Sequence, residues 1–200
     1  MADGTPIAIR EIDKKLAESG CSKNDIFHVT VQAKDIKSIG EFGAPYLAWL
    51  GDHRPTRVFV QPKESPEDAL AVITVNFNSE AKVPVHFPGT DPSKLPYSAG
   101  MRTGDKHLSI SGQIVPDEHL RDDYGAQVVG VISKVQTVVK TAGFDNGDVT
   151  KLGVFVLNNE NIDKLEVLLK EHFPNAKLEF VICENLPFGV QFEVAGTASK

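Results

Sequence analysis

The sequence predicts an α+β protein made of two copies of one unit, each unit a β-sheet packed against two helices. Short runs rich in β-branched and aromatic residues alternate with helical patterns of apolar residues along the chain. The same signals also occur twice, at a constant offset of 123 residues: Gly20 before Asp25-Ile26, and Gly143 before Asp148-Val149. A repeat of this length indicates duplicated domains and not a solenoid.

The first copy opens with a helix and a strand. Thr5 is expected to cap this helix, with Pro6 at its first position, where the missing N–H costs nothing. Apolar residues then recur at helical spacing until Gly20, which is typical of a helix end. Residues 26–31 alternate as expected for a strand.

A second helix and two strands complete the first copy. Apolar spacing over residues 36–50 predicts a helix whose middle is irregular, because Pro45 lacks the N–H that an inner helical turn needs. Residues 57–61 and 69–77 are expected to be strands, with a turn at residues 65–68.

Four prolines between residues 79 and 98 should interrupt regular structure. Residues 84–95 are therefore the expected linker, which divides a truncated first unit at residues 1–83 from a complete second unit at residues 96–200. The second unit should start with a hairpin that turns at Gly104-Asp105 and continues as a strand over residues 106–114. The first unit has no residues for such a hairpin.

The rest of the second unit repeats the order of the first. The clearest helical stripe in the chain runs from Val128 to Ala142 and must cover a sheet or another helix. It is followed by an expected strand, a helix and two further strands, at residues 149–157, 162–173, 177–183 and 189–195.

Composition limits the possible functions. The net charge is −6 and the basic residues form no block or stripe, which disfavours nucleic acid as a partner. Apolar runs are too short for a membrane span. Two cysteines and an N-terminus without a signal peptide favour the cytoplasm. Six histidines without ligand spacing predict no metal, and no sequence signature of a cofactor site is present.

Several short motifs give the chain a family resemblance. The first half carries Asp25-Ile26, Lys34-Asp35-Ile36 and Arg54-Pro55-Thr56-Arg57, and the second carries Pro96-Tyr97, Ser111-Gly112-Gln113, Ala142-Gly143, Asp148-Val149, Leu186-Pro187 and Glu193. In this order and spacing they resemble the Rid family of reactive intermediate deaminases, also labelled endoribonuclease L-PSP. The resemblance implies two Rid-like (chorismate-mutase-like) units, the first without its opening hairpin. It also implies self-association into a homo-oligomer, with small-molecule clefts between units.

The resemblance further implies hydrolysis of imines or enamines that derive from amino acids, with an arginine holding the substrate carboxylate. The second copy keeps Tyr97, Ser111, Gly112 and Glu193 of the family pattern. It has Leu178 where the arginine should stand, with Lys177 adjacent, and Glu166 where the family usually has asparagine.

The first copy shows the reverse pattern. Arg57 falls on the arginine position, but Val72 replaces the glutamate. Since neither copy is complete, the simplest hypothesis is a composite cleft between the two units. Arg57 would bind an anion that carries an imine, enamine or carbonyl group, Glu193 would act as acid and base, and Tyr97 and Ser111 would shape the pocket.

Gly112, Lys177 and Glu166 are further candidates for substrate binding. The alternative is a binding or assembly module that kept the fold and lost turnover. Taken residue by residue, Arg57 and Glu193 can also be solvated surface charges, and Tyr97 and Ser111 can simply end a hairpin. Whether Arg57 and Glu193 meet in one cleft separates the two hypotheses.

Overall fold

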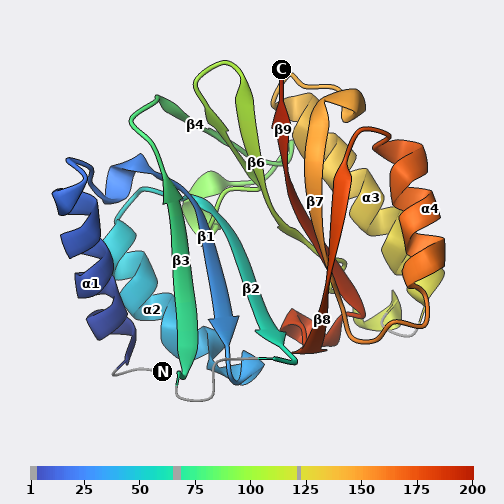
Figure 1. The fold of residues 1–200 in the computed structure, drawn as a ribbon, viewed down its shortest axis with the longest axis horizontal. Coiled ribbons are helices and arrows are strands. Elements are labelled where there is room, and N and C mark those ends of the chain that lie inside the picture. Colours follow the sequence, from blue (N-terminus) through green and yellow to red (C-terminus); the bar gives the residue numbers. More distant parts are fainter. Residues whose placement is uncertain (1–3, 65–68, 121–122) are drawn as a thin grey trace.

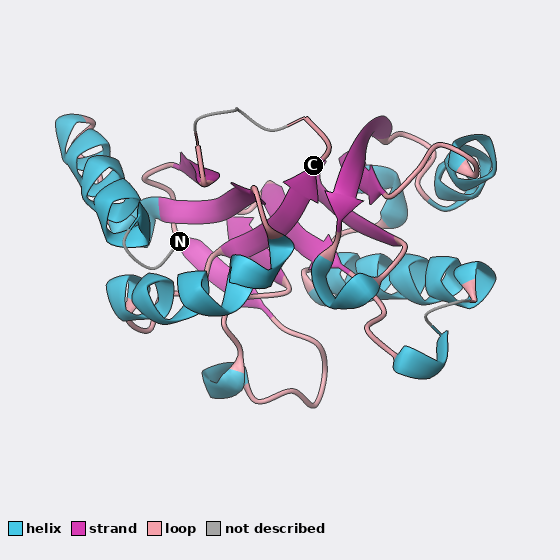
Figure 2. Ribbon diagram, turned by 90° about the horizontal axis from the view of Figure 1, so that it is seen from below, coloured by secondary structure: helices cyan, strands magenta, loops and turns pink. Residues whose placement is uncertain are grey.

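Nine strands form one mixed sheet in the computed structural model, which describes residues 4–64, 69–120 and 123–200 (Figure 1). Their order across the sheet is β3-β1-β2-β8-β7-β9-β6-β5-β4. The strands are β1 (Ile26–Ala33), β2 (Thr56–Pro62), β3 (Ala71–Phe77), β4 (Lys82–Val85), β5 (Gly100–Thr103), β6 (His107–Gln113), β7 (Val149–Val156), β8 (Lys177–Asn185) and β9 (Phe192–Ser199). The described residues also form four α-helices. They flank the sheet, with α1 (Gly4–Glu18) and α2 (Ile39–Leu50) at one end of it and α3 (Tyr124–Thr141) and α4 (Ile162–His172) at the other (Figures 1 and 2).

The first unit comprises α1 (Gly4–Glu18), α2 (Ile39–Leu50) and three strands. β1 pairs with β2 in parallel and with β3 in antiparallel orientation. Phe42, Tyr46 and Leu50 recur every four residues on α2 and are buried against this part of the sheet. The helical spacing of these apolar residues explains why the segment packs as a helix on the sheet.

The second unit repeats the arrangement with α3 (Tyr124–Thr141) and α4 (Ile162–His172). β7 pairs with β8 in parallel and with β9 in antiparallel orientation. Here Leu152 of β7 lies between Leu178 and Gly196, just as Val29 of β1 lies between Arg57 and Val75 in the first unit. The predicted duplication is confirmed, and the hairpin of β5 and β6 has no counterpart in the first unit.

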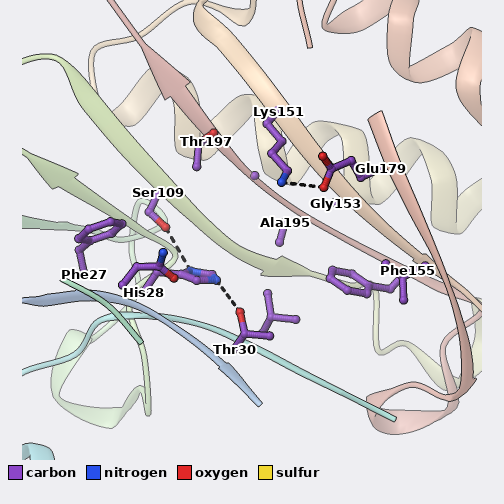
Figure 3. A pocket seen from close by; sticks show the side chains of 14 residues that line it. Phe27, His28, Thr30, Ser109, Lys151, Gly153, Phe155, Glu179, Ala195 and Thr197 are labelled. Carbon is purple, nitrogen blue, oxygen red and sulfur yellow. Dashed lines mark hydrogen bonds and ion pairs between the residues drawn. The ribbon is translucent and has the colours of Figure 1, made fainter. Parts of the chain in front are cut away.

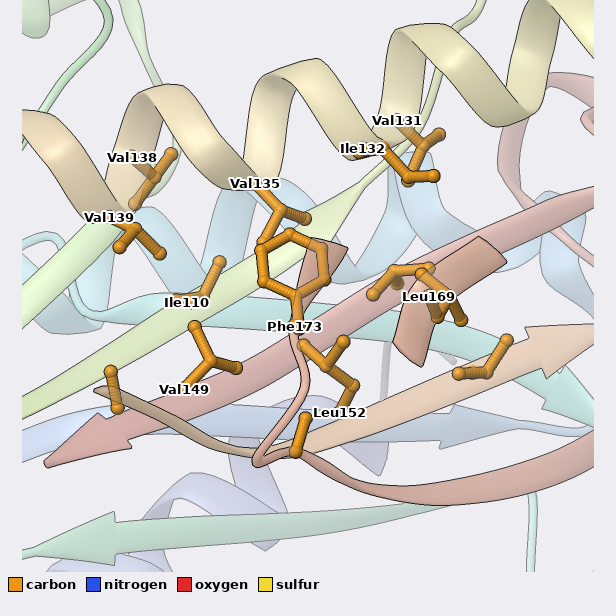
Figure 4. Packing of buried hydrophobic residues seen from close by; sticks show 14 of the residues in the cluster. Ile110, Val131, Ile132, Val135, Val138, Val139, Val149, Leu152, Leu169 and Phe173 are labelled. Carbon is orange, nitrogen blue, oxygen red and sulfur yellow. The ribbon is translucent and has the colours of Figure 1, made fainter. Parts of the chain in front are cut away.

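The largest hydrophobic core lies under α3 in the second unit. The stripe that includes Val131, Val135 and Val138 packs against Ile110 of β6 and Leu152 of β7 (Figure 4). The prediction that the apolar face of this helix covers a sheet or another helix is therefore confirmed.

The two units share one sheet because their edge strands pair. β2 and β8 are antiparallel neighbours at Gln61 and Asn185, with an irregular register at Pro62 and Cys183. Val58, Val60 and Cys183 belong to a small apolar cluster that fills this junction. The units are therefore joined by backbone pairing and by a buried apolar contact.

Three local predictions need correction. The first helix begins at Gly4, so Thr5 lies inside it and is not its cap. α2 is continuous through Pro45 because burial of Phe42, Tyr46 and Leu50 outweighs the missing N–H. The last strand begins at Phe192 and not at residue 189, since residues 187–189 form a 3₁₀ turn in which Phe188 has a φ of 59°. The turn expected at residues 65–68 lies outside the described residues.

Regular structure also extends into the proline-rich segment. β4 includes Pro84 and pairs with β5 at the edge of the sheet, where a residue without N–H is tolerated. The division of the chain by a linker at residues 84–95 stays a prediction. Among the helices that the described residues form, none combines the length and the apolar composition needed to cross a membrane.

Candidate functional site

Arg57 lies on β2 at the place where the first unit meets the hairpin of the second. Its backbone N–H donates a hydrogen bond of 2.9 Å to Oγ of Ser111 on β6. The Ser111 hydroxyl donates in turn to the carbonyl of Ser98 at 2.6 Å. The Ser98 hydroxyl donates to the carbonyl of Arg54, also at 2.6 Å. These contacts fix the segment before β5 against the start of β2.

The guanidinium of Arg57 lies near two tyrosine rings. Its central carbon is 4.8 Å from the ring centroid of Tyr97 and 5.7 Å from that of Tyr46 on α2. Both distances are within the range of cation–π attraction. Among the residues that the structure describes, no oxygen accepts a hydrogen bond from the guanidinium. Arg57 is 9% exposed, and burial lowers its pKa, although an arginine keeps its charge at neutral pH.

Glu193 on β9 completes the cluster from the second unit. It is 3% exposed, and its Oε2 has no hydrogen-bond partner among the described residues. Burial raises the pKa of Glu193 to about 8, and the nearby charge of Arg57 opposes this increase. The protonated form of the carboxyl group therefore predominates at pH 7.

Gly112 makes room for the Glu193 carboxyl group. A methyl group at Gly112 would lie 1.6 Å from Oε1 of Glu193 and 2.5 Å from its Cδ, so any larger residue would displace the carboxyl group. The absence of a side chain at this position is therefore a requirement of the cluster.

The structure brings five of the seven candidate residues together: Arg57, Tyr97, Ser111, Gly112 and Glu193. Lys177 and Glu166 lie elsewhere. The Lys177 side chain is 76% exposed and pairs with Glu179 at 3.0 Å, at the end of β8 farthest from β2. Glu166 is exposed on α4. Both belong to the second unit, where Leu178 stands at the register position that Arg57 has in the first.

Two members of the cluster were not identified from the sequence. Tyr46 follows the helical spacing of the apolar residues on α2, so the sequence pattern indicated only a core residue. In the structure its hydroxyl group is buried and has no hydrogen-bond partner among the described residues. Burial raises the pKa of Cys183 to about 12, and the nearby Glu193 carboxyl group adds to this increase. The Cys183 thiol therefore stays protonated and is a poor nucleophile.

The raised pKa of Glu193 should make the free energy of unfolding depend on pH. The ordinary value is 4.5, so between pH 4.5 and about 8 the folded protein holds a proton that the unfolded chain releases. The free energy of unfolding should therefore fall as the pH rises through this range. Glu193→Gln, which stays neutral, should gain stability relative to the wild type from pH 5 to pH 9. Urea unfolding of both proteins at several pH values measures this, and parallel pH profiles would contradict it.

Comparison with known proteins finds one family model and several relatives that match this chain. Residues 90–200 match the family model for endoribonuclease L-PSP. A RutC family protein of Pyrococcus abyssi is 35% identical over 66 residues, which are 33% of this chain and 52% of that protein. A RutC family protein of Pyrococcus horikoshii is 32% identical over 71 residues, which are 36% of this chain and 56% of that protein. The chain thus spans about half the length of the curated relatives it matches.

Solved structures share the fold. A protein of unknown function from the Rid family of Yersinia pestis superposes with a TM-score of 0.52 and 21% identity, over 60% of this chain and all of that one. A chorismatase superposes with a TM-score of 0.77 and 12% identity, over 99% of this chain and 70% of that one. The arrangement of both units in one chain therefore has a counterpart in a known structure.

Proposed function

This chain belongs to the endoribonuclease L-PSP (Rid) family, and we propose that its two units together bind a small imine, enamine or carbonyl compound that carries a carboxylate. Water addition, tautomerisation or cyclisation would follow. One observation carries the proposal. Arg57 of the first unit is hydrogen-bonded to Ser111 of the second, and the Glu193 carboxyl group lies against the next residue, Gly112, so the charged residues that the two units divide between them are brought together in one chain.

Arg57 suits the recognition of a carboxylate. A guanidinium donates two parallel hydrogen bonds that match the two oxygens of a carboxylate. The guanidinium is held between Tyr46 and Tyr97 and has no carboxylate bonded to it among the described residues. An incoming anion would therefore not have to displace a protein carboxylate.

Glu193 is suited to donate a proton first and to accept one afterwards. In imine hydrolysis, its protonated carboxyl group would give a proton to the imine nitrogen while water adds to the imine carbon. The resulting carboxylate would take a proton from that water. Return of that proton to the nitrogen breaks the C–N bond, while the hydroxyl group of the intermediate gives its own proton to the Glu193 carboxylate. Ammonia and a carbonyl compound then leave, and Glu193 is protonated again. A pKa of about 8 keeps the acid form available at neutral pH.

The hairpin residues would position these two groups. Ser111 fixes the backbone of Arg57, and Gly112 leaves space for the Glu193 carboxyl group. Tyr97 would cover the guanidinium and the bound ligand on one side. Their expected role is positioning, since the hydroxyl proton of Ser111 is already donated to the carbonyl of Ser98.

A crystal structure with a small 2-oxo acid, such as pyruvate, tests the proposal. The carboxylate should lie on Arg57 and the keto oxygen near Glu193, with the Tyr97 ring beside the bound ligand. A 2-oxo acid found only elsewhere on the protein, or no bound ligand at saturating concentration, would contradict it.

The family name refers to ribonuclease activity, for which this chain offers little support. With a net charge of −6 and a cluster that contains a buried acid, we expect affinity for RNA of roughly 10⁻⁴ M or weaker at physiological salt. A gel-shift titration with single-stranded and duplex RNA measures it. Tight, saturable binding would overturn this expectation.

Self-association is a further expectation. β3 and β4 are the two edges of the sheet, and unpaired strand edges favour contact with another chain. Light scattering at micromolar concentration should therefore give a mass above the 21.8 kDa of one chain. A strict monomer would count against it.

A further inference from the structure

A cavity of about 370 Å³ lies between the two units on the face of the sheet opposite to the helices (Figure 3). The first unit contributes His28, Thr30 and Val58 to its wall, and the second contributes Ser109 and Lys151. Its volume lies in the range of small-molecule sites. Both units are needed to form it.

This cavity is separate from the cluster around Arg57. Neighbouring residues of a strand point to opposite faces of the sheet. Val58 lines the cavity, whereas Arg57, one residue earlier, points toward Tyr46 on α2. A ligand in the cavity would therefore contact neither Arg57 nor Tyr97.

Hydrogen bonds on one wall determine the position of a proton. The Thr56 hydroxyl donates to the carbonyl of Phe27 at 2.8 Å, so its oxygen can only accept from its other neighbours. These neighbours are Nδ1 of His28 at 2.8 Å and Oγ of Ser109 at 2.7 Å. Oγ of Ser109 also lies 3.2 Å from Nδ1 of His28. If Ser109 donated to Nδ1, both short contacts of the Thr56 oxygen would lack a proton, so we assign a proton to Nδ1 of His28, with Ser109 donating to Thr56 and Nε2 left as an acceptor.

The same chain of bonds makes this wall an acceptor surface. Nε2 of His28 accepts from the Thr30 hydroxyl at 3.1 Å. Burial lowers the pKa of His28 to about 4, so the ring is neutral. Because Thr30 and Ser109 have both given their protons to protein atoms, their oxygens face a ligand as acceptors. They fit a hydroxyl, amide or ammonium donor.

The opposite wall carries positive charge. Lys151 pairs with Glu179 at 2.6 Å (Figure 3). Lys177 pairs with the same carboxylate at 3.0 Å. The two lysines hold the pKa of Glu179 below its ordinary value. Lys177 does not line the cavity, but it also neutralises Glu179, so the Lys151 ammonium group leaves a local excess of positive charge at this wall, which fits an anion.

Apolar residues connect the two walls. Val58, Val181 and Ala195 line the middle of the cavity, and the ring of Phe155 lies over Gly153, where a side chain would meet it at 3.5 Å. We propose that this cavity is a second ligand site, which takes a small carboxylic acid with a hydroxyl, amide or ammonium group at its other end. The carboxylate would face Lys151, and the donor would face Thr30 and Ser109.

Methyl NMR can test the site in an Arg57→Ala background, which removes the candidate anion site described above. The probes are 3-hydroxybutyrate, butyrate, which lacks the donor, and 1,3-butanediol, which lacks the carboxylate. The methyl signals of Val58, Val181 and Ala195 should shift with 3-hydroxybutyrate, and its affinity should exceed that of either other probe by about tenfold.

Variants separate this site from unspecific binding. Lys151→Met should weaken 3-hydroxybutyrate binding by about tenfold and Thr30→Val by about threefold, whereas Lys164→Met, the same charge change on the exposed face of α4, should have no effect. Equal affinity for the three probes, equal binding by both lysine variants, or unshifted cavity methyls would overturn the proposal. Because Arg57 is absent from the protein used, the result tests the second ligand site independently of the proposed function.

Discussion

Replacement of Arg57 by alanine is expected to weaken the binding of 2-oxo acids by about 10- to 150-fold, because it removes a charge-assisted pair of hydrogen bonds to the carboxylate. Arg57→Lys should recover only part of the affinity, since an ammonium group cannot reproduce the two parallel donors. Calorimetric titration of pyruvate against the wild type and both variants measures these differences. Arg10→Ala, on the exposed face of α1, controls for the loss of one positive charge.

Equal affinities in the wild type and the Arg57 variants would exclude the composite site. A second readout comes from Glu193, whose pKa is kept down by the charge of Arg57. Arg57→Ala should therefore raise the pKa of Glu193 still further, and carboxyl titration by NMR detects this. An unchanged Glu193 pKa would mean that the two residues do not interact, whatever the affinity shows.

Glu193→Gln is expected to lower the hydrolysis of an imino acid by about 10²- to 10⁴-fold while 2-oxo acids still bind. The amide keeps the size of the carboxyl group in the space above Gly112 but cannot exchange a proton. Ammonia release from an imino acid that an amino-acid oxidase forms in the assay measures turnover. Glu184→Gln, an exposed change on β8, should leave it unchanged.

Two outcomes of that assay would have different meanings. Unchanged turnover in Glu193→Gln would exclude Glu193 as the acid and base. Absence of turnover in the wild type, together with binding of 2-oxo acids that depends on Arg57, would favour the binding module over the enzyme.

The elements of the fold could mostly be predicted from the sequence. Helical and alternating patterns of apolar residues mark the faces that must be buried, and they recur in both halves in the same order. The errors fall where packing outweighs local preference. Pro45 stays in a helix because its neighbours on that face are buried, and Pro84 joins a strand because that strand is an edge.

The sequence by itself determined which residues each unit keeps: Arg57 in the first, and Tyr97, Ser111, Gly112 and Glu193 in the second. Only the tertiary structure decided that they meet in one chain, since β2 pairs with β8 and the hairpin of the second unit packs against Arg57. It also decided that Lys177 pairs with Glu179 and that Tyr46 borders the guanidinium. The physical reason is that local patterns report which face of an element is buried, whereas contacts between units depend on how distant elements pair and pack.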